Sequence, residues 1–139
     1  MQCGSFWRRH GDVLAVIALG GALGSLARWA LASVLPEAAR LPWATFVENL
    51  SGAFALGLLL VFVLEVWPPS RYARPFLAVG VLGGYTTFST YMLDTRNLLA
   101  VGEVAAASAY LLGTLGLGLL AVELGAAAGR LVVARGRRR

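Results

Sequence analysis

The sequence contains no lysine, one cysteine and one histidine, and only 14% of its 139 residues are charged. Cys3 cannot form a disulfide within the chain and has no companion cysteine for a metal site. His10 stands alone before the first apolar segment, where a solvated side chain is a simpler interpretation than a catalytic base. The chain also lacks a phosphate-binding glycine loop, a paired-cysteine motif and a nucleophile elbow. We therefore do not expect an enzyme.

Apolar residues dominate the composition instead. They make up 58% of the chain, and the mean hydropathy is +0.73. A globule of this size has too little interior to bury so much apolar surface, so lipid is the better solvent. The composition predicts an all-α integral membrane protein with the lipid bilayer as its partner.

Four apolar segments approach or exceed the length of about 20 residues that a membrane-spanning helix needs. They cover residues 13–35, 44–67, 73–99 and 104–133. The connections are short, which predicts a single membrane domain followed by a basic tail at 134–139. The arginines before the first segment imitate a signal peptide, but the length of that segment and its Arg28 favour a retained span.

Arginine is unevenly divided between the two sides of this arrangement. All 12 basic residues are arginine, and the net charge is +5. The side with both termini and the second loop holds Arg8, Arg9, Arg71, Arg74, Arg135, Arg137, Arg138 and Arg139. The opposite loops hold Arg40 and Arg96, so the positive-inside rule predicts cytoplasmic termini. Because the tail directly follows an apolar run, we expect it to meet anionic lipid and not nucleic acid.

Small residues recur four positions apart on three segments, which places them on one face of each helix. Such residues let helices approach closely in lipid, so they predict packing faces and say little about chemistry. The predicted packing positions are Gly20 and Gly24, Ala53 and Gly57, and Ala121, Gly125 and Gly129.

The third segment contains a run, residues 83–91, that is poorly suited to a continuous helix. It holds two adjacent glycines and three threonines. Broken backbone at membrane depth is tolerated where it is buried in protein or lines a wet cavity, and it frees backbone groups to meet an ion. We therefore expect the third helix to break near mid-membrane. The alternative is a kinked helix whose hydroxyls bond to their own backbone.

Neutral hydrogen-bond donors on the other segments support an ion path. Asn49 lies in the second segment, and Tyr110 and Thr114 share one face of the fourth. All three donate hydrogen bonds without carrying charge. Phe88 and Tyr91 are neighbours on their helix and can present positive ring edges. Such a lining suits a small anion that must bind and then leave.

Three motifs resemble the Fluc (CrcB) family of fluoride channels. Residues 83–91 are similar to its glycine-glycine-x-threonine-threonine-phenylalanine-serine-threonine-phenylalanine signature. Residues 20–29 resemble its first-helix motif, and Asn49-Leu50-Ser51-Gly52 resembles its asparagine-x-x-glycine. The motifs follow the family's order and, with four spans, cover nearly the whole chain. The resemblance implies passive export of toxic cytoplasmic fluoride across the bacterial inner membrane.

The resemblance also implies an antiparallel, dual-topology dimer with two fluoride pores along the subunit interface. Phe88 and Tyr91 would be its aromatic pore residues, Asn49 its amide, and Thr114, with Tyr110 beside it, part of its polar track. The hydroxyls of Thr87 and Ser89 complete the candidate pore set. The backbone carbonyls of Gly83 and Thr86 would hold a central structural sodium ion (Na+). Two positions depart from the family pattern: Tyr91 replaces the second phenylalanine, and Gly118 replaces a hydroxyl of the polar track.

Three ionisable residues have more than one possible role. Arg28 can snorkel, cap carbonyls or draw anions to a vestibule, and we favour a structural role. Asp94 follows the polar run, and we expect it to face a pore mouth. Glu48 would repel an anion unless it points away or burial protonates it.

Two questions stay open at this level. The arginine bias conflicts with a homodimer of opposed subunits, so either the positive-inside rule is overridden or the partner is an oppositely oriented homologue. The main rival function is a four-span, proton-coupled exporter of cationic drugs, which needs an embedded carboxylate such as Glu48. A purely structural subunit is the third alternative, but it leaves the polar third segment without a purpose.

Overall fold

The computed structural model describes residues 3–35 and 41–136, with side chains from His10 onward. Arg40 and Arg137–Arg139 lie outside the described residues, and so do the side chains of Cys3, Arg8 and Arg9. In the described part, all regular structure is helical. The elements are α1 (Cys3–Val34), α2 (Trp43–Val61), the π-helical η1 (Phe62–Val66) and η2 (Pro75–Leu82), α3 (Gly83–Tyr85), α4 (Phe88–Ala100) and α5 (Val104–Gly136).

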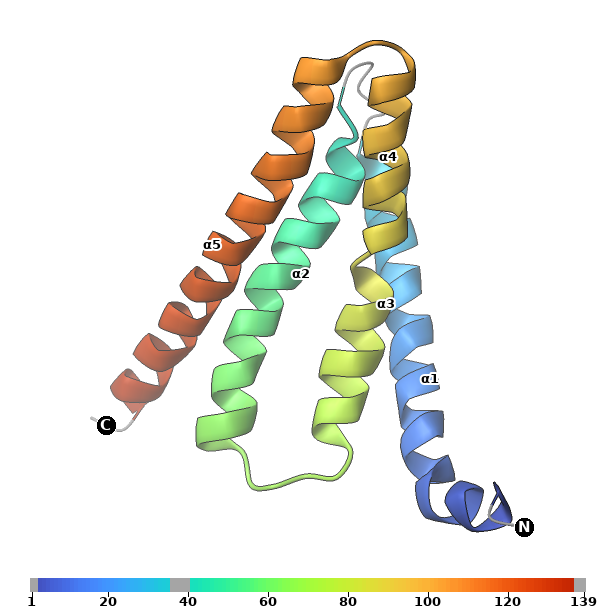
Figure 1. The fold of residues 1–139 in the computed structure, drawn as a ribbon. Coiled ribbons are helices and arrows are strands. Elements are labelled where there is room, and N and C mark those ends of the chain that lie inside the picture. Colours follow the sequence, from blue (N-terminus) through green and yellow to red (C-terminus); the bar gives the residue numbers. More distant parts are fainter. Residues whose placement is uncertain (1–2, 36–40, 137–139) are drawn as a thin grey trace.

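Four stretches of these helices are long and apolar enough to cross a membrane, as the sequence predicted. They are His10–Val34, Trp43–Val66, Pro75–Ala100 and Val104–Gly136. Consecutive stretches run in opposite directions, and both termini lie at the lower end of Figure 1. The turn between α4 and α5 lies at the opposite end, where Gly102 adopts the left-handed φ of 81° that favours glycine.

The third stretch changes its packing partner halfway along. Its first half, η2 and α3, packs against α1, whereas its second half, α4, packs against α5. The second stretch, α2, lies along α5 (Figure 1). The point at which the third stretch changes partner coincides with an interruption of its helical backbone, described below.

Glycines allow the closest helix contacts, as their spacing predicted. A Cβ atom on Gly24 would overlap the carbonyl oxygen of Val81, and one on Gly57 would overlap that of Val122. Close backbone approach of this kind is the main source of helix association in lipid. The glycines in such backbone contacts include Gly20, Gly24, Gly57 and Gly125, and Gly129 lies against the side chain of Val61.

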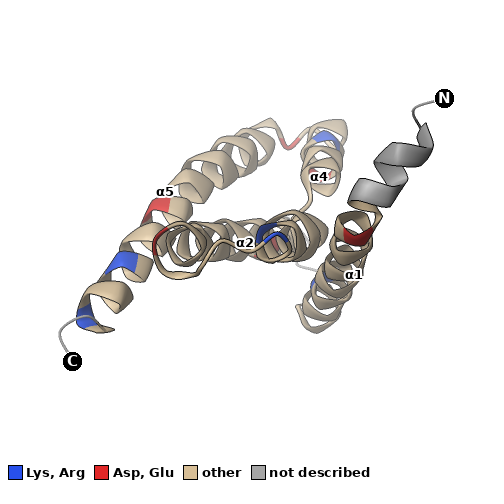
Figure 2. Cartoon of the chain, turned by 90° about the horizontal axis from the view of Figure 1, so that it is seen from below, with Lys and Arg blue, Asp and Glu red and all other residues tan. Residues whose placement is uncertain are grey.

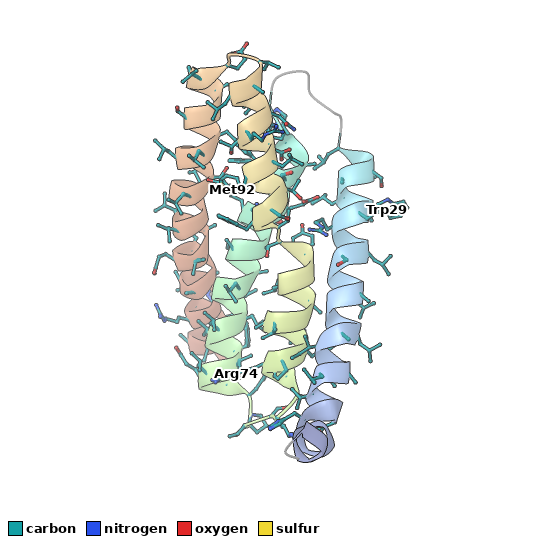
Figure 3. The ribbon with its side chains drawn as sticks, turned by 45° about the vertical axis from the view of Figure 1, so that its right-hand side comes forward. Trp29, Arg74 and Met92 are labelled. Atoms are coloured by element: carbon teal, nitrogen blue, oxygen red, sulfur yellow. The ribbon has the colours of Figure 1, made fainter. Side chains whose placement is uncertain are left out.

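Most large apolar side chains face outward. Trp29 is 71% exposed, and Figure 3 shows it pointing away from the other helices. A soluble protein would not present so much apolar surface, which needs lipid or another protein subunit to cover it. The buried apolar core of the described part is small and comprises Val61, Tyr91, Ala107 and Tyr110.

Candidate functional site

The third stretch is interrupted at Thr86 and Thr87, whose backbone is extended (ψ of 155° and 120°). The Thr86 hydroxyl donates to the carbonyl of Leu82 (2.9 Å) and closes the end of α3. The Thr87 hydroxyl accepts from the N–H of Thr90 (3.2 Å) and caps the start of α4. The threonines that disfavour a continuous helix therefore stabilise the ends on both sides of the interruption.

Asn49 of α2 satisfies the backbone of Thr87 in both directions. Its amide nitrogen donates to the Thr87 carbonyl (3.0 Å), and its amide oxygen accepts from the Thr87 N–H (2.9 Å). An extended residue between two helices has both groups unpaired, and a primary amide offers the matching donor and acceptor. One amide hydrogen is used in this pair, which leaves the second for another acceptor. The pore role of Asn49 stays a prediction, but its role in holding the interruption is visible.

The carbonyls of Gly83 and Thr86 lose their usual helical donors. In a continuous helix they would accept from the N–H groups four residues later, those of Thr87 and Thr90. Those two groups instead donate to Asn49 and to the Thr87 hydroxyl. Neither carbonyl therefore has its helical donor, and unwound backbone carbonyls coordinate Na+ in some membrane proteins.

Three aromatic rings form a continuous cluster beside the interruption. The ring centroids of Phe88 and Tyr91 lie 6.0 Å apart at 61°, and those of Tyr91 and Tyr110 lie 5.4 Å apart at 56°. Phe88 is 74% exposed, whereas Tyr91 is buried. The Tyr91 hydroxyl donates to the carbonyl of Leu111 (2.5 Å). The hydroxyl that distinguishes Tyr91 from the family's phenylalanine thus ties α4 to α5.

Polar side chains continue the cluster toward the upper end of the molecule. The Tyr110 hydroxyl donates to Asp94 (3.4 Å), and Thr45 of α2 lies close to the same tyrosine. Thr45 and Tyr110 are both buried. Sequence reasoning missed Thr45, although it precedes Asn49 by four residues and so lies on the same face of α2.

Thr114 lies one turn beyond Tyr110 and has an unusual environment. It is only 6% exposed, and its hydroxyl has no hydrogen-bond partner among the described residues. A buried hydroxyl without a partner destabilises a protein by about 1–3 kcal/mol. Next along this face is Gly118, where an added Cβ would meet nothing within 4 Å. The Thr114 hydroxyl therefore has unused hydrogen-bonding capacity, and the protomer encloses it.

The other two charged candidates, Glu48 and Arg28, lie near Asp94. Glu48 is 3% exposed. The positive charge of Arg28 and the negative charge of Asp94 both lie near its carboxyl group. Its carboxylate is thus turned into the protein and not toward lipid. The proximity of Arg28 and Glu48 fits the structural role favoured for the arginine. Ser89, in contrast, is exposed beside Phe88, with its hydroxyl 3.4 Å from that of Thr87.

A family model described as CrcB-like protein, Camphor Resistance (CrcB), matches residues 15–126. The chain belongs to this family. Its relatives include the fluoride-specific ion channel FluC 3 of Streptomyces avermitilis, which is 55% identical over 129 residues. That match covers 92% of this chain but 63% of the relative, so the chain spans less than two thirds of its length.

Two further relatives match over most of both chains. The fluoride-specific ion channel FluC 2 of Nocardia farcinica is 47% identical over 127 residues, or 91% of each protein. The fluoride-specific ion channel FluC of Thermus thermophilus is 48% identical over 112 residues, which cover 79% of this chain and 89% of the relative. These names describe channels and not enzymes, in agreement with the absence of catalytic motifs from the sequence.

Proposed function

We propose that the chain is a subunit of a fluoride-selective channel that lets cytoplasmic fluoride leave the cell passively. The observation that carries the proposal is the buried Thr114 hydroxyl without a partner, set beside an aromatic cluster and a capped helix interruption. The names of three relatives support fluoride as the ion.

The neutral donors of the site suit a small, strongly hydrated anion. The Thr114 hydroxyl, the second amide hydrogen of Asn49 and the ring edges of Phe88 and Tyr91 replace its water in steps. None of these groups carries a full positive charge, so the ion is not held too tightly to leave. The site therefore conducts fluoride down its gradient without a coupled ion.

The interruption of the third stretch lies near the bilayer midplane in this proposal. Their position in the sequence supports this depth, because Thr86 and Thr87 lie near the middle of the apolar stretch Pro75–Ala100. The freed carbonyls of Gly83 and Thr86 would hold the structural sodium ion. Its positive charge would stabilise carbonyls that lack helical donors.

The channel is proposed to be an antiparallel dimer with pores along the subunit interface, in the bacterial inner membrane. Phe88 and Ser89 support a second subunit, because two residues of the signature motif face outward beside the site. An exposed hydroxyl at membrane depth is unfavourable against lipid and acceptable against protein. The second subunit covers this face.

The charge distribution favours an oppositely inserted homologue as that subunit. In the described part, the end with the termini carries Arg71, Arg74, Arg130 and Arg135, whereas the other end carries Arg28 and Arg96. Labelling of Cys3 on intact cells with an impermeant thiol reagent tests the orientation. Complete protection indicates one fixed orientation and a homologous partner. Labelling of about half the molecules indicates two copies of this chain in opposite orientations.

Fluoride efflux from proteoliposomes tests the function, with the partner chosen by the labelling result. The native protein should release fluoride, exclude chloride and need no proton gradient. Phe88→Ile and Thr114→Val should each lower the flux by at least about tenfold, equivalent to about 1.4 kcal/mol for a lost ion contact. Leu112→Ile, on the exposed face of α5, is the matched control and should conduct normally.

The outcomes separate channel and exporter. Efflux of an organic cation that depends on a proton gradient and on Glu48 would establish the exporter instead. Absence of fluoride efflux from a folded, correctly paired protein would refute the channel proposal.

A further inference from the structure

A pocket of about 540 Å³ lies at the end of the molecule that carries the termini, remote from the candidate pore. It is formed by the turn between the second and third stretches. Its lining residues include the apolar Val63 and Leu64 and the basic Arg71 and Arg74. The pocket therefore combines apolar and basic lining residues.

The pocket lies where lipid headgroups are expected. The second apolar stretch ends at Val66 and the third begins at Pro75, so residues 67–74 lie at the membrane boundary. Trp67 lines the pocket and is exposed, as is typical of aromatic residues at the interface. Figure 3 shows Arg74 at this end of the helices.

The turn that presents the two arginines is fixed by hydrogen bonds. The Ser70 hydroxyl accepts from the N–H groups of Tyr72 (3.3 Å) and Ala73 (3.2 Å). Asp12 of α1 bonds both Arg71 (3.0 Å) and the Tyr72 hydroxyl (2.6 Å). The bond to Asp12 raises the pKa of the Tyr72 hydroxyl, which donates this bond. The turn is thus anchored to the first helix.

The charge in this region is not balanced. Asp12 neutralises Arg71, and Arg130 lies 3.8 Å from Glu65. Arg74 is exposed and forms no ion pair with any carboxylate in residues 10–35 or 41–136. Figure 2, viewed from this end, shows basic positions near the centre of the view and along α5. Arg74 therefore contributes an uncompensated positive charge to a pocket at headgroup depth.

We propose that this pocket binds the headgroup phosphate of an anionic phospholipid. Arg74 supplies the attraction, Arg71 a second guanidinium held in place by Asp12, and Val63 and Leu64 contact the first carbons of the acyl chains. A guanidinium matches phosphate geometry, and one arginine near an anionic lipid surface contributes about 1 kcal/mol. A zwitterionic lipid carries its own cation beside the phosphate, so it competes poorly for this charge.

Native mass spectrometry of the purified protein in neutral detergent tests the proposal, with phosphatidylglycerol as the probe. Arg74→Gln should weaken binding about fivefold, the factor that corresponds to about 1 kcal/mol. Arg74→Lys should retain most of the binding because it keeps the charge. Arg135→Gln is the matched control, since this arginine lies near the same end on α5 but outside the pocket.

Each result bears on the proposal. Equal binding by native protein and Arg74→Gln, an equal loss in Arg135→Gln, or equal binding of phosphatidylcholine would overturn it. Displacement of the lipid by soluble glycerol phosphate at the same concentration would show that the pocket takes free phosphate instead. Fluoride flux is measured separately, because loss of lipid binding leaves the ion pathway in place.

Discussion

Replacing Asn49 with leucine should destabilise the protein by about 2–4 kcal/mol. The substitution removes both hydrogen bonds to Thr87, at 3.0 and 2.9 Å. An unsatisfied buried backbone group destabilises by about 1–3 kcal/mol, although hydrogen bonds between membrane helices average only about 0.6 kcal/mol. Because Thr87 is 7% exposed, little water can replace the lost amide. We therefore expect the cost of two unsatisfied backbone groups and not the smaller average for bonds between membrane helices.

Equilibrium unfolding in mixed detergent micelles, followed by circular dichroism, measures this difference. Asn97→Leu is the matched control, because Asn97 is an exposed asparagine on α4. The same chemical change there should alter stability by less than about 0.5 kcal/mol. Fluoride flux through Asn49→Leu should also fall, because the interruption loses its anchor. If both variants unfold alike, the amide does not hold the interruption and the reasoning is wrong.

Three other substitutions test separate parts of the structure. Tyr91→Phe removes the hydrogen bond to the Leu111 carbonyl, so the free energy of unfolding should fall by about 1 kcal/mol while fluoride flux persists. Loss of flux would show instead that the hydroxyl takes part in the ion path. Gly24→Ala forces a Cβ atom against the Val81 carbonyl and should lower the free energy of unfolding by about 1–3 kcal/mol in the same assay. Gly11→Ala is the control, because a Cβ atom at Gly11 would meet nothing within 4 Å, and an equal effect there would contradict the packing argument. Glu48→Gln removes a buried carboxyl group, which if charged would repel a nearby anion by up to about 1 kcal/mol, so flux should rise up to about fivefold. Unchanged flux would refute a charged Glu48 beside the ion path.

Local sequence signals were informative where the structure depends on local properties. Apolar length predicted four helical stretches, because lipid leaves few ways to satisfy the backbone. Glycine spacing predicted the contact faces at Gly24 and Gly57, because only a missing side chain permits backbone contact there. The poor helix formers of residues 83–91 marked the segment in which the backbone leaves the helix. None of these signals needed knowledge of a distant residue.

The parts that sequence reasoning missed are contacts between distant residues. Asn49 and Thr87 are 38 positions apart, and nothing local shows that the amide completes the backbone of the threonine. The bond from Tyr91 to the Leu111 carbonyl and the contact of Thr45 with Tyr110 are similar cases. The π-helical turns of η1 and η2 were not predicted either, and no residue in them explains the wider turn. Helix propensity shows which residues resist a helix, but not which neighbours satisfy them.

The way the interruption is satisfied bears directly on passive transport. Asn49, Thr86 and Thr87 pair several of its backbone groups with protein groups, so the protein itself holds much of the extended geometry. An ion that had to break the helix would spend part of its binding free energy on that change, and each passage would wait for the rearrangement. In the proposed channel, the conducted ion would meet a backbone that is already held open, beside a Thr114 hydroxyl that has no partner among the described residues. Weak, stepwise contacts at a preformed site are what rapid passage of a strongly hydrated anion requires.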